Sequence, residues 1–150
     1  MQIKVGDFGL ATQLQYEGER KKTICGTPNY IAPEILDNKM IYGGPTGHSY
    51  EVDYWSIGVI VYTLLVGRPP FESPEVKNTY KKIKACSYTF PEGNKMSEEA
   101  KCFIAAVLVL DPKKRLSLRQ MMEHEFMTMS HIPDLMPVSS LVCAPTHTQC

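Results

Sequence analysis

The sequence has little of three things: unbalanced charge, paired cysteines and uninterrupted apolar length. Its 16 basic and 16 acidic residues give a formal net charge of zero, which argues against a non-specific nucleic-acid binder because such domains usually carry a basic excess. The five cysteines are scattered without a CxxC pair, so we expect reduced thiols of a cytosolic or nuclear protein, without disulfides or zinc. The apolar run at 57–66 is shorter than the ~20 residues of a membrane span, so we expect no association with a membrane.

What is present is the composition of a globular domain. Hydrophobic residues make up 43% of the chain and charged residues 21%, which is enough to form a core. Residues 2–5 alternate between polar and apolar side chains and predict a short strand. Residues 10–31 have no sustained period, so we expect a long ordered loop of the kind that usually has a function.

The central element is a helix predicted over residues 50–66. It is apolar on nearly every side, which is typical of a helix buried at the centre of a fold. Ser49 is expected to cap its N-terminus, and Gly67 is expected to end it.

Three further helices are predicted from the residues at their N-termini. One opens at Ser73-Pro74-Glu75, where proline suits the first helical position. Another opens at Ser97 and continues into an apolar stripe. Ser117 and Gln120 form a capping box for the last, which runs to about His124. We therefore expect a mainly α fold.

Three motifs with a known chemistry follow one another along the chain. They are Asp7-Phe8-Gly9, Ala32-Pro33-Glu34 and Asp53-Tyr54-Trp55-Ser56-Ile57-Gly58. The first is frequent by chance, but followed by a long loop and Ala-Pro-Glu it is the pattern of a protein kinase activation segment. With Arg115 further on, the motifs resemble the C-terminal lobe of a eukaryotic-type protein kinase, over residues 2 to about 127.

The finer resemblance is to the polo-like serine/threonine kinases. It rests on Glu19–Glu34 and on Tyr62–Glu72, and Gly26-Thr27-Pro28 favours serine/threonine over tyrosine kinases. The resemblance implies ATP-dependent phosphoryl transfer to Ser or Thr of protein substrates in cell-cycle control. It also implies a location in cytoplasm and nucleus, including the centrosome or spindle.

The resemblance gives roles to residues at the front of the activation segment. Asp7 would bind Mg²⁺ bridging the nucleotide phosphates, Phe8 would pack to set active or inactive geometry, and Gly9 would give backbone freedom. Thr23 would be the activating site for an upstream kinase, since a phosphate there can order the loop through basic partners. The plainer interpretations are a turn aspartate and an ordinary loop threonine.

Further residues would serve the substrate side. Gly26-Thr27-Pro28 resembles the family's substrate pocket, where Thr27 meets the catalytic aspartate, although a plain turn threonine is the alternative. Glu34 and Arg115 resemble its buried ion pair, which ties the activation segment to the late helices. Asp53 resembles the residue that supports the catalytic loop.

The same resemblance indicates what this stretch does not supply. The sequence contains no His-Arg-Asp and no GxGxxG, and only six residues precede Asp7, so we expect the N-terminal lobe and the catalytic loop to be absent. The resemblance then implies a partial kinase domain at 1–127 and an extended tail or linker at 128–150. ATP and Mg²⁺ would serve the full-length parent, and this chain alone is expected to bind neither usefully and to be inactive.

Three interpretations stay open at this point. The chain is a portion of an active polo-like kinase, a truncated lobe that acts as a non-catalytic binding decoy, or a partial gene model. An upstream exon with His-Arg-Asp would favour the first, and an authentic start at Met1 the second. Residues 37–46 look like an insertion relative to the family, either genuine or intron-derived, and a longer surface loop costs little stability.

Overall fold

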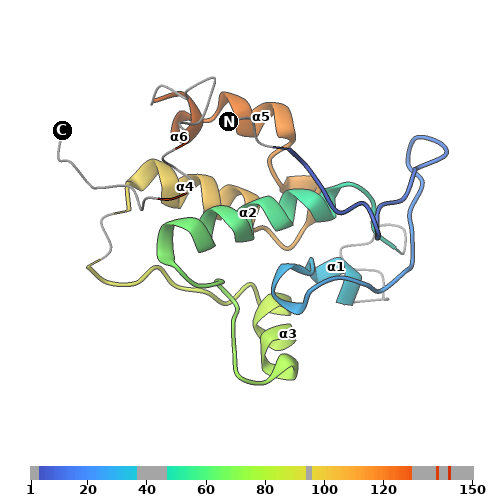
Figure 1. The fold of residues 1–150 in the computed structure, drawn as a ribbon, viewed down its shortest axis with the longest axis horizontal. Helices are drawn as coiled ribbons and strands as arrows, with labels where there is room; N and C mark the ends of the chain where they lie inside the picture. Colours follow the sequence, from blue (N-terminus) through green and yellow to red (C-terminus); the bar gives the residue numbers. More distant parts are fainter. Residues whose placement is uncertain (1–3, 37–46, 94–95, 130–137, 139–141, 143–150) are drawn as a thin grey trace.

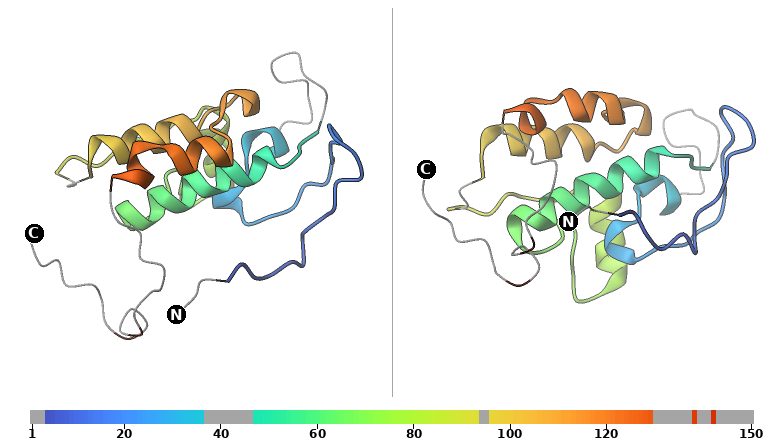
Figure 2. Two further views of the ribbon diagram at one scale, coloured as in Figure 1. Left: turned by 90° about the horizontal axis from the view of Figure 1, so that it is seen from above. Right: turned by 45° about the horizontal axis from the view of Figure 1, so that its top comes forward.

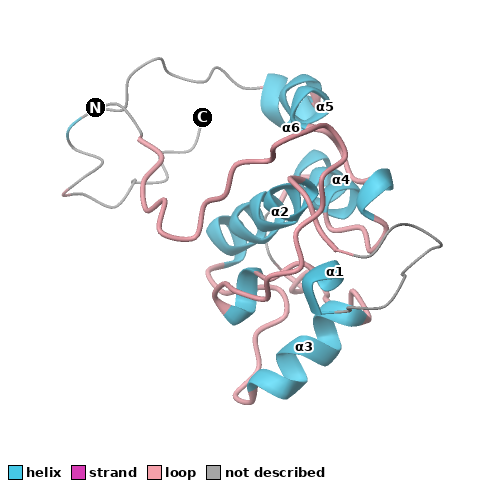
Figure 3. Ribbon diagram, turned by 90° about the vertical axis from the view of Figure 1, so that its right-hand side faces the viewer, coloured by secondary structure: helices cyan, strands magenta, loops and turns pink. Residues whose placement is uncertain are grey.

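The computed structural model describes residues 4–36, 47–93 and 96–129, together with Val138 and Val142. These residues form helices joined by loops, and Figure 3 shows no strand among them. In chain order the helices are η1 (Pro28–Tyr30), α1 (Pro33–Leu36), α2 (Glu51–Val66), α3 (Val76–Lys84), α4 (Glu98–Val107), η2 (Pro112–Lys114), α5 (Leu118–Glu123) and α6 (Glu125–Thr128).

Helix α2 lies in the middle of the arrangement (Figure 1). Helix α4 packs along it, and α6 packs on α4 and α5. On the other side, η1 contacts α2, and α3 packs against both η1 and α1. The central position predicted for this helix is therefore confirmed.

The core forms where α2 meets its neighbours on these two sides. Trp55 and Val59 of α2 are fully buried with Phe71, Ile83 and Ile104, and the Trp55 and Phe71 rings stack at 5.4 Å. Each such side chain contributes about 1.5–3 kcal/mol when it is removed from water. A second cluster joins α4 to α5 through Phe103, Val107 and Met121.

One side of α2 is exposed, which corrects the prediction that it is buried all round. Ile60 and Leu65 are exposed, and Leu64 retains 79% of its accessible surface. The described elements cover the side of the helix that carries Trp55 and Val59. A sequence that is apolar on every side cannot indicate which side its partners will cover.

The helix starts agree with the sequence only in part. Ser97 caps α4 through its hydroxyl, which accepts from the Ala100 amide at 3.3 Å, and the Ser117–Gln120 capping box opens α5. Both predictions are confirmed. The other two were wrong, because α2 follows Tyr50 and α3 follows Glu75 without any side-chain cap.

The failed caps have a physical reason in each case. The Ser49 hydroxyl is buried and has no hydrogen-bond partner among the described residues, so it does not cap the N-terminus of α2. At α3, Glu75 keeps an extended backbone with φ of −105° and ψ of 126°, so the helix begins only at Val76 and Pro74 stays outside it. Helix α2 does end at Gly67, as predicted.

Some predicted features differ or lie outside the described residues. Lys4 and Val5 form no strand, because a strand needs a neighbour to pair with; the rest of 2–5, the 37–46 insertion and nearly all of 130–150 are not described. His124 ends α5 and also caps α6, since its ring accepts from the Phe126 amide. In the described ranges, the helices lack the combination of length and hydropathy that a bilayer crossing needs.

The division of the aliphatic side chains into buried and exposed predicts two very different substitutions. Ile104→Ala should lower the free energy of unfolding by about 2–5 kcal/mol, because the site is fully buried. Leu64→Ala, on the exposed side of α2, should change it by less than about 0.5 kcal/mol. Urea unfolding followed by circular dichroism measures both, and equal losses would show that the core is wrongly located.

Candidate functional site

The site begins with the loop that carries the first motif. Figure 2 shows residues 4–27 running along the outside of the helices in an extended path. Asp7 has a left-handed backbone with φ of 60°, and its carboxylate accepts from the Gly9 amide at 3.4 Å. Phe8 is 68% exposed, so the packing expected of this ring does not occur with the described residues.

The described residues do not fit a magnesium site on their own. Nowhere among them do three or more His, Cys, Asp or Glu side chains gather closely enough to hold a metal ion. Asp7 is exposed and offers one carboxylate. Magnesium demands near-octahedral oxygen coordination, usually from phosphates and waters as well as protein, so a single carboxylate does not define its site.

The middle of the loop is anchored to the residues just before α2. Lys21 and His48 exchange two backbone hydrogen bonds of 2.8 and 2.9 Å, and Arg20 Nε donates to the carbonyl oxygen of Gly47 at 3.0 Å. The Arg20 guanidinium also lies 4.0 Å from the Glu51 carboxylate. These contacts hold the loop against the start of α2 although some 27 residues separate the partners.

Charge also orders the loop locally. Lys21 Nζ contacts the carboxylate of Glu19 at 2.6 Å, and the hydrogen bond from Lys21 lowers the pKa of Glu19. Thr23, which follows, is exposed. The predicted phosphorylation site therefore lies on the surface, next to a short anchored segment.

The end of the loop turns inward to meet α2. The Thr27 carbonyl accepts from the Tyr30 amide at 3.0 Å and begins η1. The Tyr30 carbonyl in turn accepts from the Ser56 hydroxyl at 3.2 Å. This chain of hydrogen bonds fixes the Gly26-Thr27-Pro28 stretch above the first turns of α2.

A cavity of about 370 Å³ lies between the front of the loop, its end and the start of α2. Its walls include Leu10, Leu14, Thr27, Ile31, Val52 and Asp53. The structure therefore brings Gly26, Thr27 and Asp53 to one cavity, whereas Asp7 and Thr23 are not among its lining residues.

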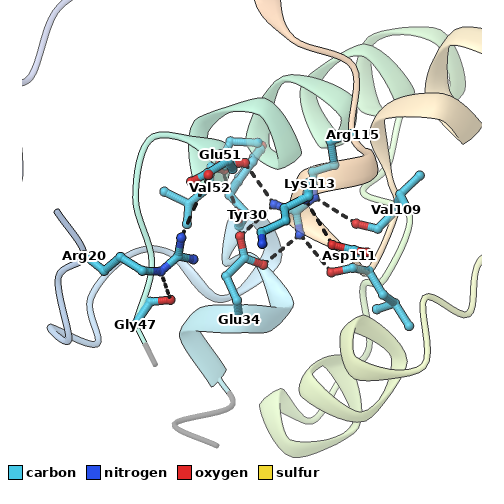
Figure 4. Close-up of polar contacts among 12 residues, drawn as sticks. Arg20, Tyr30, Glu34, Gly47, Glu51, Val52, Val109, Asp111, Lys113 and Arg115 are labelled. Carbon is cyan, nitrogen blue, oxygen red and sulfur yellow. Dashed lines mark hydrogen bonds and ion pairs between the residues drawn. The ribbon is translucent and has the colours of Figure 1, made fainter. Parts of the chain in front are cut away.

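The strongest polar contact of the site joins Glu34 of α1 to Arg115 (Figure 4). Two parallel bonds connect them, from Nη1 and Nη2 of the guanidinium to the two carboxylate oxygens, each 2.7 Å long. Both side chains are buried. The predicted partners thus meet in a bidentate, charge-assisted pair, the geometry in which Arg binds carboxylate most strongly.

Arg115 uses its remaining donors on the backbone around it. Its Nε donates to the Val109 carbonyl at 2.8 Å, and its Nη1 donates to the Glu51 carbonyl at 2.9 Å. The guanidinium carbon lies 5.1 Å from the centre of the Trp55 ring, within the range of a cation–π interaction. A buried charge needs this many partners to offset the loss of water.

The comparisons with known proteins agree with this architecture. Residues 1–127 match the family described as protein kinase domain, and the chain therefore belongs to that family.

Within that family its relatives are polo-like serine/threonine kinases. The chain is 55% identical over 148 residues to a probable serine/threonine-protein kinase PLK of Dictyostelium discoideum, which covers 99% of this chain and 14% of that protein. It is 50% identical over 145 residues to the serine/threonine-protein kinase polo of Drosophila melanogaster, covering 97% and 24%. It is also 50% identical over 122 residues to the cell cycle serine/threonine-protein kinase CDC5/MSD2 of Saccharomyces cerevisiae, covering 81% and 17%. The chain spans less than a quarter of each.

His48 and Gly47 are the residues of the site that the sequence did not reveal. Their partners lie about 25 residues earlier in the chain, and no periodicity or motif connects the two stretches. The one available signal was a Gly-His pair shortly before a helix, which is compatible with many surface turns.

The ion pair predicts a large and non-additive effect on stability. Glu34→Ala and Arg115→Ala should each lower the free energy of unfolding by about 3–5 kcal/mol, because each leaves a buried charge unpaired. The double mutant should lose less than the sum. Arg119 and Glu123, an exposed pair on α5 at 3.0 Å, are the matched control and should contribute about 0.3–0.5 kcal/mol. Additive losses at Glu34 and Arg115, measured by urea unfolding, would contradict the coupling.

Proposed function

We propose that this chain forms the activation segment and the substrate-side platform of a polo-like serine/threonine protein kinase. The whole kinase would transfer the γ-phosphoryl group of ATP to Ser or Thr of protein substrates. The observation that carries the proposal is the bidentate Glu34–Arg115 pair, which fixes the end of the loop beside the cavity that Thr27 and Asp53 line.

Positioning is the contribution that such a platform can make. Phosphoryl transfer leaves little covalent chemistry to the protein, so catalysis comes from placing the reactants and stabilising charge. Thr27 and Asp53 approach the cavity from opposite elements, the loop and α2. Asp53 would support the backbone of a catalytic loop, and Gly26-Thr27-Pro28 would meet the substrate beside it.

Thr23 is proposed as the site where an upstream kinase switches the enzyme on. It is exposed, which leaves its hydroxyl accessible, and Lys21 and Lys22 precede it. A phosphate there would add a charge of about −1.5 to −2 and three acceptor oxygens. Basic groups could then hold the segment in one conformation.

Asp7 is proposed as a single ligand of the magnesium that accompanies ATP in the whole kinase. The described residues contain no group of three or more side chains that could hold a metal ion, so the other ligands would come from ATP, water and the rest of the kinase. The chain alone is therefore not expected to hold Mg-ATP usefully.

The setting we propose is cell-cycle control in the cytoplasm and nucleus, including the centrosome or spindle. The name of the yeast relative, a cell cycle kinase at 50% identity, supports this proposal. The partners would be protein substrates and the upstream kinase that modifies Thr23.

Substitution of Thr23 tests its regulatory role. In the full-length kinase, Thr23→Val should lower the phosphorylation of casein by about 10- to 100-fold, the value of one or two hydrogen bonds to a charged group. Thr89→Val, at an exposed threonine that does not line the cavity, should leave the rate unchanged. Equal rates for the original protein and Thr23→Val would remove Thr23 from the mechanism.

Calorimetry tests the proposed dependence on the rest of the kinase. The 150-residue chain titrated with Mg-ATP should give no micromolar binding, and a radiolabelled phosphate assay on casein should remain at background. The reason is that positioning alone supplies about 7–11 kcal/mol of catalysis and one carboxylate cannot provide it. Micromolar binding that Asp7→Asn abolishes, together with phosphate transfer, would overturn this expectation.

A further inference from the structure

One contact beside Thr23 has no part in the function proposed above. The Nε2 atom of the His48 ring lies 2.8 Å from the backbone carbonyl oxygen of Thr23. A carbonyl oxygen can only accept a hydrogen bond, so Nε2 carries the proton and donates it. The imidazole therefore holds the backbone at Thr23 and leaves the threonine side chain exposed.

The contact belongs to a group of hydrogen bonds between residues 20–23 and residues 47–48. Lys21 and His48 form the antiparallel bridge, and Arg20 bonds to the Gly47 carbonyl. We call the His48 contacts with Lys21 and Thr23, with the Arg20–Gly47 bond, the His48 latch.

Gly47 makes the close approach of the two stretches possible. Its φ of 106° is a conformation that residues with a side chain rarely adopt. A β-carbon at this position would also lie only 2.6 Å from the Lys21 carbonyl oxygen and 3.2 Å from the Arg20 β-carbon. The latch therefore requires glycine at position 47.

We propose that His48 is a positioning residue, whose imidazole fixes the outer edge of the activation segment at Thr23 before this threonine is phosphorylated. The His48 latch and a phosphate on Thr23 would then stabilise the same ordered segment by separate means. The latch acts on the backbone carbonyl, so it does not need the threonine hydroxyl. The regulatory part of this inference rests on the proposed function of Thr23, whereas the positional part does not.

Three variants of His48 separate the hydrogen bond from simple packing. His48→Phe keeps a ring but has no donor, and His48→Gln provides an amide N–H at a similar reach. Hydrogen-exchange mass spectrometry of the full-length protein, on the peptide spanning residues 19–25, should show the bonded Lys21 amide exchanging about three- to tenfold faster in His48→Phe. His48→Gln should restore it, and Gly47→Ala should resemble His48→Phe.

His124→Gln is the matched control, because His124 caps α6 in another part of the fold, and it should leave exchange at Lys21 unchanged. Unchanged exchange at Lys21 in His48→Phe would overturn the proposal. So would a failure of His48→Gln to restore protection, because the donor would then not be what matters.

A second experiment measures kinase activity in the Thr23→Val variant, which lacks the threonine hydroxyl and keeps the backbone carbonyl. In this background, His48→Phe should lower the basal casein phosphorylation of the full-length kinase by about three- to tenfold, and His48→Gln should restore it. An unchanged basal rate in His48→Phe would overturn the regulatory part. If Thr23→Val alone has no effect, the proposed function of Thr23 fails, while faster exchange at Lys21 in His48→Phe still supports the latch.

Discussion

A single guanidinium group joins parts of this chain that are far apart in the sequence. Arg115 binds both carboxylate oxygens of Glu34, the carbonyls of Glu51 and Val109, and the face of Trp55. It thereby links the end of the long loop, the start of α2 and the connection after α4. The first two of these parts, together with the front of the loop, supply walls of the cavity. A lysine could not replace Arg115, because only the planar fork makes parallel bonds to a carboxylate while it stacks on a ring.

Most of the helical fold could be predicted from local signals. The Ser97 cap, the Ser117–Gln120 capping box and the end of α2 at Gly67 each depend on residues within one turn, and such short-range chemistry is visible in a sequence. The capping residues of α2 and α3 could not be predicted so well. A cap forms only if the side chain is free to turn back, and the Ser49 hydroxyl is buried by tertiary packing instead.

In the candidate site, too, some contacts could be predicted from the sequence and others could not. Glu34 and Arg115 could be paired in advance because the kinase motifs are ordered along the chain, although 81 residues separate the two side chains. The resemblance also pointed to Thr27 and Asp53, which share a cavity. The contacts of His48 with the loop escaped prediction, since they follow from how the chain folds back between Thr23 and α2. Long-range backbone contacts leave no periodic trace in a sequence.

The exposed side of α2 has a consequence for how readily the chain associates with other molecules. Ile60 and Leu64 lie one turn apart and form an apolar ridge on the longest helix of the described part. Exposed apolar side chains grouped on one helix are places where a protein can associate with a partner or aggregate. Polar substitutions at Ile60 and Leu64 would therefore reduce such association while the folded core stays unaffected.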